Sequence, residues 1–110
     1  MAQDFISIVE IRTTFGTRRD AEACAARLVE QRLAACVQID GPVQSTYRWQ
    51  SAVESAEEFR CTCKTSHERS QACIAALIRD HPYQTPEVIR VEVTASPAYA
   101  GWVRASVEAD

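Results

Sequence analysis

The order in which two kinds of hydrophobic periodicity alternate constrains the fold of this 110-residue chain more than any other feature. Apolar residues at every second position are typical of half-buried strands, whereas apolar residues at every third or fourth position are typical of amphipathic helices. The pattern predicts strands at residues 4–14, 36–50, 58–65 and 88–94, and helices that begin near Arg18, after Ser66 and at Ser96-Pro97. The predicted order is therefore strand, helix, strand, strand, helix, strand, helix.

Two βαβ-like halves of this kind form a ferredoxin-like βαββαβ sandwich, an α+β fold in which one antiparallel sheet carries two helices on one face. A C-terminal helix follows, and the two middle strands form a long hairpin. Gly41-Pro42 marks a bend or bulge in the first hairpin strand. We expect a single domain over residues 1–110, because a chain of this length builds one core and has little surplus stability unless it oligomerises.

The second face of the sheet is expected to be bare. Strand alternation places on it Glu10, Arg12, Arg60, Thr62, Lys64, Arg90 and Glu92. These charges of mixed sign can pair across strands or between subunits, or face water in a monomer. Aromatic residues favour self-association, because Tyr47 and Trp49 lie on the projecting hairpin, Trp102 lies near the C-terminus, and aromatics are enriched at interfaces.

Charge and cysteine content narrow the class of protein. The net charge of −3 and the absence of a basic stripe argue against nucleic acid as a partner. The N-terminal residues include neither a basic segment nor an apolar stretch long enough for a signal peptide or a membrane span, so we expect a cytoplasmic protein with no membrane partner. Five irregularly spaced cysteines fit reduced thiols better than a disulfide framework.

Three of the cysteines require separate interpretation. Cys61 and Cys63 share a strand face with Phe59, which favours buried packing over a soft-metal site. Cys36 follows small residues where the first helix leads into the second strand. Close packing is the simpler role for Cys36. Among the five cysteines, Cys36 is nevertheless the best candidate for a functional thiol.

A rigid segment follows the second helix. Prolines at positions 82 and 86 bracket Tyr83 and fix the backbone around it. His81 can interact with the helix C-terminal dipole, or it can bind a metal beside Tyr83 with help from Asp80.

Anion binding and catalysis have weaker signals. Lys64 and Thr65 precede the predicted helix cap at Ser66, so a lysine and free amides converge there, although Lys64 can equally pair with a nearby glutamate. No glycine-rich phosphate loop is present. No serine, histidine and acid occur at a recognisable spacing, so the chain is not expected to be an enzyme.

Three segments, in this order, resemble the CutA family of small proteins linked to divalent-cation tolerance: Arg32-Leu33-Ala34-Ala35-Cys36-Val37, then Ser45-Thr46-Tyr47-Arg48-Trp49 with Glu58 and Lys64-Thr65, then His81-Pro82-Tyr83-Gln84-Thr85-Pro86-Glu87. The resemblance implies a homotrimer in which extended strands wrap neighbouring subunits. It also implies a role in tolerance of copper or other divalent cations, with weak metal binding and no catalysis. Tyr47, Trp49, Tyr83 and Trp102 would then be interface or pocket-wall residues, and Glu58 and Lys64 a polar pair near an intersubunit cleft.

The resemblance also bears on the metal. Family members associated with copper carry a cysteine at the end of the first strand and paired histidines before the Pro-Tyr, where this chain has Arg12 or Thr13 and Asp80-His81. The candidate metal ligands are therefore His81, Cys36 and Asp80. The alternative is a small-molecule sensor similar to the PII signal proteins, with an anion held by Lys64 and Arg12 near Glu58 and Tyr83.

Overall fold

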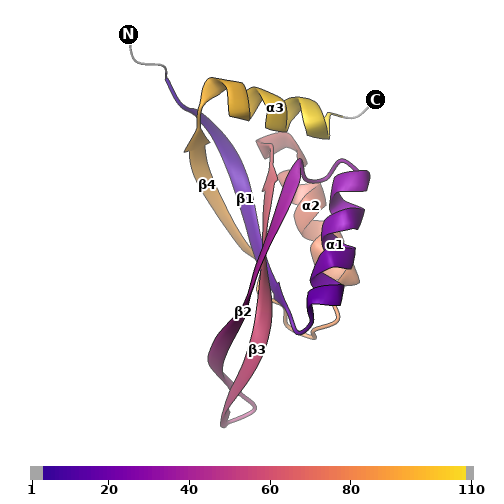
Figure 1. Ribbon diagram of the computed structural model, residues 1–110, viewed down its shortest axis with the longest axis vertical. Helices are drawn as coiled ribbons and strands as arrows, with labels where there is room; N and C mark the ends of the chain where they lie inside the picture. Colours follow the sequence, from indigo (N-terminus) through magenta and orange to yellow (C-terminus); the bar gives the residue numbers. More distant parts are fainter. Residues whose placement is uncertain (1–3, 109–110) are drawn as a thin grey trace.

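The computed structural model describes residues 4–108 and confirms the predicted element order (Figure 1). The strands are β1 (Ile6–Phe15), β2 (Cys36–Trp49), β3 (Ala52–Thr65) and β4 (Ile89–Ala95). The helices are α1 (Arg18–Glu30), α2 (His67–Asp80) and α3 (Pro97–Val107). The chain folds as a ferredoxin-like sandwich with an added C-terminal helix.

Each helix begins at a hydroxyl side chain that caps it. The hydroxyl oxygens of Thr17, Ser66 and Ser96 accept hydrogen bonds from the backbone N–H groups of Asp20, Arg69 and Tyr99, respectively, at 3.1, 3.2 and 3.3 Å. Such bonds satisfy amides that have no partner inside the helix. The cap predicted at Ser66 is confirmed, and the three caps explain why the helices begin where the sequence pattern places them.

The strands form one antiparallel sheet in the order β2-β3-β1-β4. Helices α1 and α2 cover one of its faces. Between them and the sheet lies the main core, which contains Val9, Ile11, Phe15, Ala21, Cys24, Leu28, Leu33, Ala34, Cys61, Cys63, Cys73, Ala76 and Leu77. None of the helices formed by residues 4–108 is long and apolar enough to cross a membrane.

Helix α3 packs on the opposite face of the sheet, at one end. Its Ala100, Val103 and Val107 bury Ile8 of β1 and contact Val93 of β4. Beyond α3 this face is uncovered, and it carries polar residues as predicted: Glu10, Arg12, Arg60, Thr62 and Lys64. We call this surface the open face.

Arg90 and Glu92 do not lie on the open face, contrary to the sequence prediction. In the register between β4 and β1, Glu92 is opposite Val9 and Arg90 is opposite Ile11, and both apolar residues belong to the main core. Directly opposite residues of an antiparallel pair point to the same side of the sheet. The alternation along β4 was predicted correctly but its phase was wrong, because α3 covers the other side of the strand near Val93.

The β2–β3 hairpin extends past the rest of the sheet as a two-stranded arm (Figure 1). Strand β1 pairs only with residues 59–65 of β3, so residues 43–49 and 52–58 form the arm. The register between β2 and β3 shifts between Asp40 and Val43, where Gly41 has a φ of 142° and the Gly41-Pro42 bond is cis. The predicted bulge is confirmed, and it marks the base of the arm.

Candidate functional site

The predicted site residues fall into two groups rather than one. Glu58, His81 and Tyr83 meet at the base of the arm, and we call them the arm-base cluster. Lys64, Arg12 and Cys36 lie on the open face, nearer to α3. Glu58 and Lys64 are six positions apart on one strand, roughly 20 Å at the usual rise per residue, so they do not form a polar pair within one chain.

His81 is held through both of its ring nitrogens. Its Nε2 lies 2.9 Å from the carbonyl oxygen of Thr14, and its Nδ1 accepts a hydrogen bond of 3.1 Å from the backbone N–H of Tyr83. Because a carbonyl only accepts and an amide only donates, the proton resides on Nε2 and the ring is neutral. The ring also stacks on Phe15 at 4.4 Å, and burial lowers the pKa of His81. This geometry fits a residue that fastens the rigid segment to β1.

Tyr83 connects the rigid segment to the arm. Its hydroxyl donates a hydrogen bond of 3.0 Å to the carboxylate of Glu58. Burial, and then this bond to Glu58, raise the pKa of Tyr83 to about 12, so the phenol stays protonated at neutral pH. A Cβ atom on Gly16 would lie 3.3 Å from the Tyr83 hydroxyl, so the glycine leaves room for the ring. The arm-base cluster therefore joins the rigid segment to the arm through hydrogen bonds.

The carboxylate of Asp80 forms ion pairs with two guanidinium groups. Arg79 donates to both carboxylate oxygens at 3.0 Å, and Arg27 lies 3.9 Å away. The hydrogen bond from Arg79 lowers the pKa of Asp80. Asp80 and His81 also line a cavity between α1 and α2, with a volume of about 10 Å³, which is room for about one water molecule.

The open-face residues form a row across the sheet. Cys36, Lys64 and Glu10 occupy matched positions on β2, β3 and β1. The Nζ of Lys64 lies 5.4 Å from the centre of the Tyr99 ring, which allows a cation–π contact. Arg12 forms an ion pair with Glu10 at 3.0 Å. The row therefore combines positive charge, an aromatic ring and a half-buried thiol.

The predicted metal ligands His81, Cys36 and Asp80 are not brought together. Cys36 lies on the open face, whereas Asp80 and His81 lie at the end of α2 on the other side of the sheet. Within residues 4–108, no three histidine, cysteine, aspartate or glutamate side chains are placed to hold a metal ion. A single chain thus offers no complete cation site among the residues that the structure describes.

Four of the five cysteines are core residues. Cys24, Cys61, Cys63 and Cys73 are buried between the sheet and the two helices. Burial raises the pKa of Cys24 to about 11 and that of Cys61 to about 12, and Cys63, which shares a hydrogen bond with Cys73, also has a raised pKa. A thiol with a raised pKa is a poor nucleophile and a poor metal ligand at neutral pH. The predicted packing role of Cys61 and Cys63 is confirmed.

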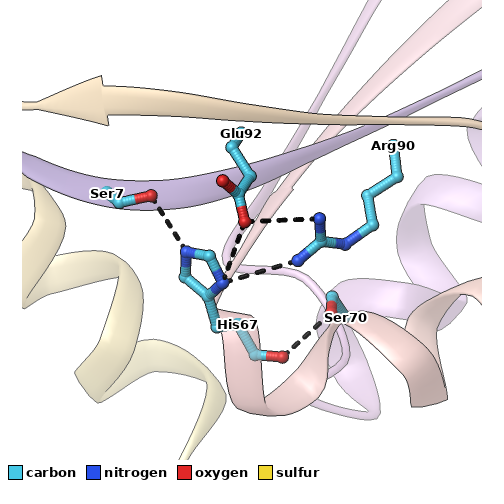
Figure 2. Close-up of polar contacts among 5 residues, drawn as sticks. All are labelled: Ser7, His67, Ser70, Arg90 and Glu92. Carbon is cyan, nitrogen blue, oxygen red and sulfur yellow. Dashed lines mark hydrogen bonds and ion pairs between the residues drawn. The ribbon is translucent and has the colours of Figure 1, made fainter.

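One polar cluster was missed by the sequence analysis. Figure 2 shows Ser7 of β1, His67 of α2, and Arg90 and Glu92 of β4 around a single imidazole ring. Ser7 and His67 are 60 positions apart, so no spacing rule could have linked them. The approach of Arg90 and Glu92 to α2 was missed because the sequence analysis placed both residues on the wrong face of β4.

Comparison with known proteins identifies the family. The sequence model of the CutA1 divalent ion tolerance proteins matches residues 9–106. The divalent-cation tolerance protein CutA of Salmonella newport (strain SL254) is 35% identical over 106 residues, covering 93% of this chain and 92% of that protein. The solved structure of CutA from Synechococcus elongatus PCC7942 has a TM-score of 0.89 at 36% identity and covers 96% of each chain. The divalent cation tolerance protein (Cut A1) of Thermus thermophilus has a TM-score of 0.86 at 30% identity, covering 94% of this chain and 100% of that one. The chain belongs to the CutA1 family of divalent ion tolerance proteins.

Proposed function

We propose that this protein supports tolerance of divalent cations, copper among them, as a homotrimer that binds cations weakly and does not transform them chemically. The observation that carries the proposal is the family match over residues 9–106, together with a fold that agrees with solved CutA structures along nearly the whole chain. The role in cation tolerance is inferred from the related proteins, which are described as divalent-cation tolerance proteins. The geometry of the arm and of the open face supports the assembly.

The arm supports self-association on physical grounds. A two-stranded ribbon without a covering layer is marginally stable in water. Here the ribbon also exposes apolar surface, since Tyr47 and Trp49 are 41% and 39% exposed and Val53 is 66% exposed. Trp102 on α3 is 49% exposed. Burying these side chains against neighbouring subunits would stabilise both the arm and the assembly.

Sedimentation equilibrium tests the assembly. The expected mass is three times the 12.2 kDa of one chain. We expect Trp49→Ala to shift the equilibrium toward smaller species. The matched control is Ile78→Ala, which removes an exposed apolar side chain from α2 and should leave the mass unchanged. A wild-type monomer at micromolar concentration would contradict the proposed trimer.

Calorimetric titration with Cu²⁺ and Zn²⁺ tests cation binding. We expect weak binding, because one chain does not assemble a complete ligand set within its described residues. Cys36→Ala should lower the affinity for copper, since the half-buried Cys36 is the soft ligand of the open face. His81→Ala and Asp80→Asn should retain binding, because their polar atoms already bond to Thr14, Tyr83 and Arg79. An intact trimer that gives no binding heat with either metal would contradict direct cation binding.

A second candidate is a PII-like sensor of a small anion. It is favoured by the placement of Lys64 and Arg12 on the same uncovered face. Titration with phosphate and with citrate distinguishes the two candidates. Under the sensor hypothesis, Lys64→Ala abolishes anion binding and leaves copper binding intact. If the wild-type protein binds neither anion, the sensor hypothesis is excluded.

We also propose a cytoplasmic location. All five cysteines are free thiols, which suits a reducing compartment. Fractionation of cells that express the protein, with a periplasmic marker as control, tests the location. Recovery with the periplasmic marker would contradict it.

A further inference from the structure

An open groove lies between the start of α2 and the end of α3, and we call it the α2–α3 groove. Its volume is about 440 Å³, within the range of about 300–1,000 Å³ that small-molecule sites occupy. It shares no lining residue with the arm-base cluster or with the row on the open face. The lining residues are Ser66, Glu68 and Arg69 at the start of α2, and Arg104, Val107 and Glu108 at the end of α3.

Two guanidinium groups line the groove from different helices. Arg69 is half-buried, and its Nε donates a hydrogen bond of 3.2 Å to the carbonyl oxygen of Arg32. Arg32 in turn donates from Nη1 to the carbonyl oxygen of Glu108 at 3.4 Å, which ties the end of α3 to the start of α2. In the part of the chain that the structure describes, no carboxylate lies within ion-pair distance of Arg69 or Arg104. Both guanidinium groups therefore keep N–H donors for a ligand.

Two carboxylates line the same groove. The backbone N–H of Glu68 and the hydroxyl of Ser66 donate hydrogen bonds to the carboxylate of Glu68, and these bonds, with the charge of Arg104, lower the pKa of Glu68. The hydroxyl oxygen of Ser66 also accepts a hydrogen bond from the backbone N–H of Arg69. These two amides are thus bonded within the chain, so recognition of a ligand falls to the side chains. Glu108 is exposed at the C-terminal end of α3.

The balance of charge in the lining decides the class of ligand. A simple anion would pair with the two guanidinium groups but would face the two carboxylates, and a simple cation would meet the opposite conflict. We infer that the α2–α3 groove binds a free α-amino acid, with its carboxylate on the guanidinium groups and its ammonium group on the carboxylates. Arginine suits the first contact, because a guanidinium pairs with a carboxylate through two parallel hydrogen bonds.

The groove reads the charged ends of the ligand more than its side chain. Among the described residues that line it, Val107 is the one apolar residue, and it is 1% exposed. We therefore expect several amino acids to bind with similar affinity. This binding site goes beyond cation tolerance, and neither the proposed trimer nor the proposed cation binding requires it.

The first test is calorimetric titration of the purified full chain with each of the twenty standard amino acids. Metal-free buffer is needed, because amino acids chelate copper and zinc. The tightest binder is then compared with its analogues, which for L-leucine are 4-methylpentanoate, without the ammonium group, and 3-methylbutylamine, without the carboxylate. Each analogue should bind at least about tenfold more weakly, since a hydrogen bond to a charged group contributes roughly that factor or more. The absence of binding by all twenty would overturn the proposal, and an analogue that binds as tightly as its amino acid would contradict recognition of both charges.

Variants then place the site in the groove. Arg104→Met should weaken binding at least about tenfold, with the urea midpoint measured in parallel to verify folding. The matched control is Arg19→Met, which removes an exposed arginine of α1 outside the groove and should leave the affinity unchanged. Glu108→Gln should weaken binding of the amino acid more than binding of the analogue without the ammonium group, a difference that a merely structural role would not produce. An unchanged affinity in Arg104→Met, or an equal loss in Arg19→Met, would contradict this placement.

Discussion

Gly41 offers a direct test of how the arm is attached to the sheet. The residue lies in the bulge at the base of the arm, and its φ of 142° is a conformation that residues with a side chain rarely adopt. A Cβ atom at this position would lie 2.9 Å from the carbonyl oxygen of Glu58 and 3.2 Å from the Cα of Phe59. Both contacts are with backbone, so no side-chain rotation relieves them. We therefore expect Gly41→Ala to displace β3 relative to β2.

The size of the effect follows from the backbone conformation and the contact. Holding a residue with a side chain in such a region costs about 1–3 kcal/mol. In a domain of this length, each kcal/mol lowers the melting temperature by about 4 °C, so Gly41→Ala should melt roughly 4–12 °C lower. Gly101 is the matched control, because it lies within α3 and a Cβ there meets nothing within 4 Å. Gly101→Ala should stabilise the protein by about 0.5–1 kcal/mol.

Thermal and urea unfolding, followed by circular dichroism, measure both variants. All samples need one protein concentration, because assembly makes the melting temperature depend on concentration. Sedimentation equilibrium of Gly41→Ala adds a second readout, since a displaced arm should weaken the proposed trimer. Equal melting temperatures for Gly41→Ala and wild type would refute the reasoning about the bulge.

Three further predictions concern the arm-base cluster and the core. Burial lowers the pKa of His81 below its ordinary value near 6.5, so as pH falls the unfolded chain takes up this proton first and stability is lost below about pH 6.5. The drop in urea midpoint between pH 7.5 and pH 5.5 should therefore shrink in His81→Gln, and an undiminished drop would argue against this role. Tyr83→Phe removes the bond to Glu58 and should cost about 0.5–1.5 kcal/mol in urea unfolding, whereas an unchanged midpoint would mean that the bond adds nothing net. Leu77→Ala should cost about 2–5 kcal/mol, because Leu77 is 2% exposed in the main core, and a cost below 1 kcal/mol would indicate that the core collapses around the gap.

Local features of the sequence determined the fold class. The caps at Thr17, Ser66 and Ser96 act within three residues of where each helix begins, and apolar periodicity distinguishes strand from helix over short windows. Gly41-Pro42 marked the bulge for the same reason, because its backbone preferences are local. These signals suffice for element order, and element order restricts a two-layer sandwich to very few topologies.

Only the tertiary structure decided where the chemistry lies. Strand alternation fixes which residues of β4 share a face, but the register with β1 and the packing of α3 decided that Arg90 and Glu92 point toward α2. The residue type of His81 suggested a metal ligand, whereas its contacts with Thr14 and Tyr83 use both ring nitrogens. The physical reason is the range of the interactions: propensities and caps act between neighbours in sequence, while a site is formed by residues that only the packing of distant elements brings together.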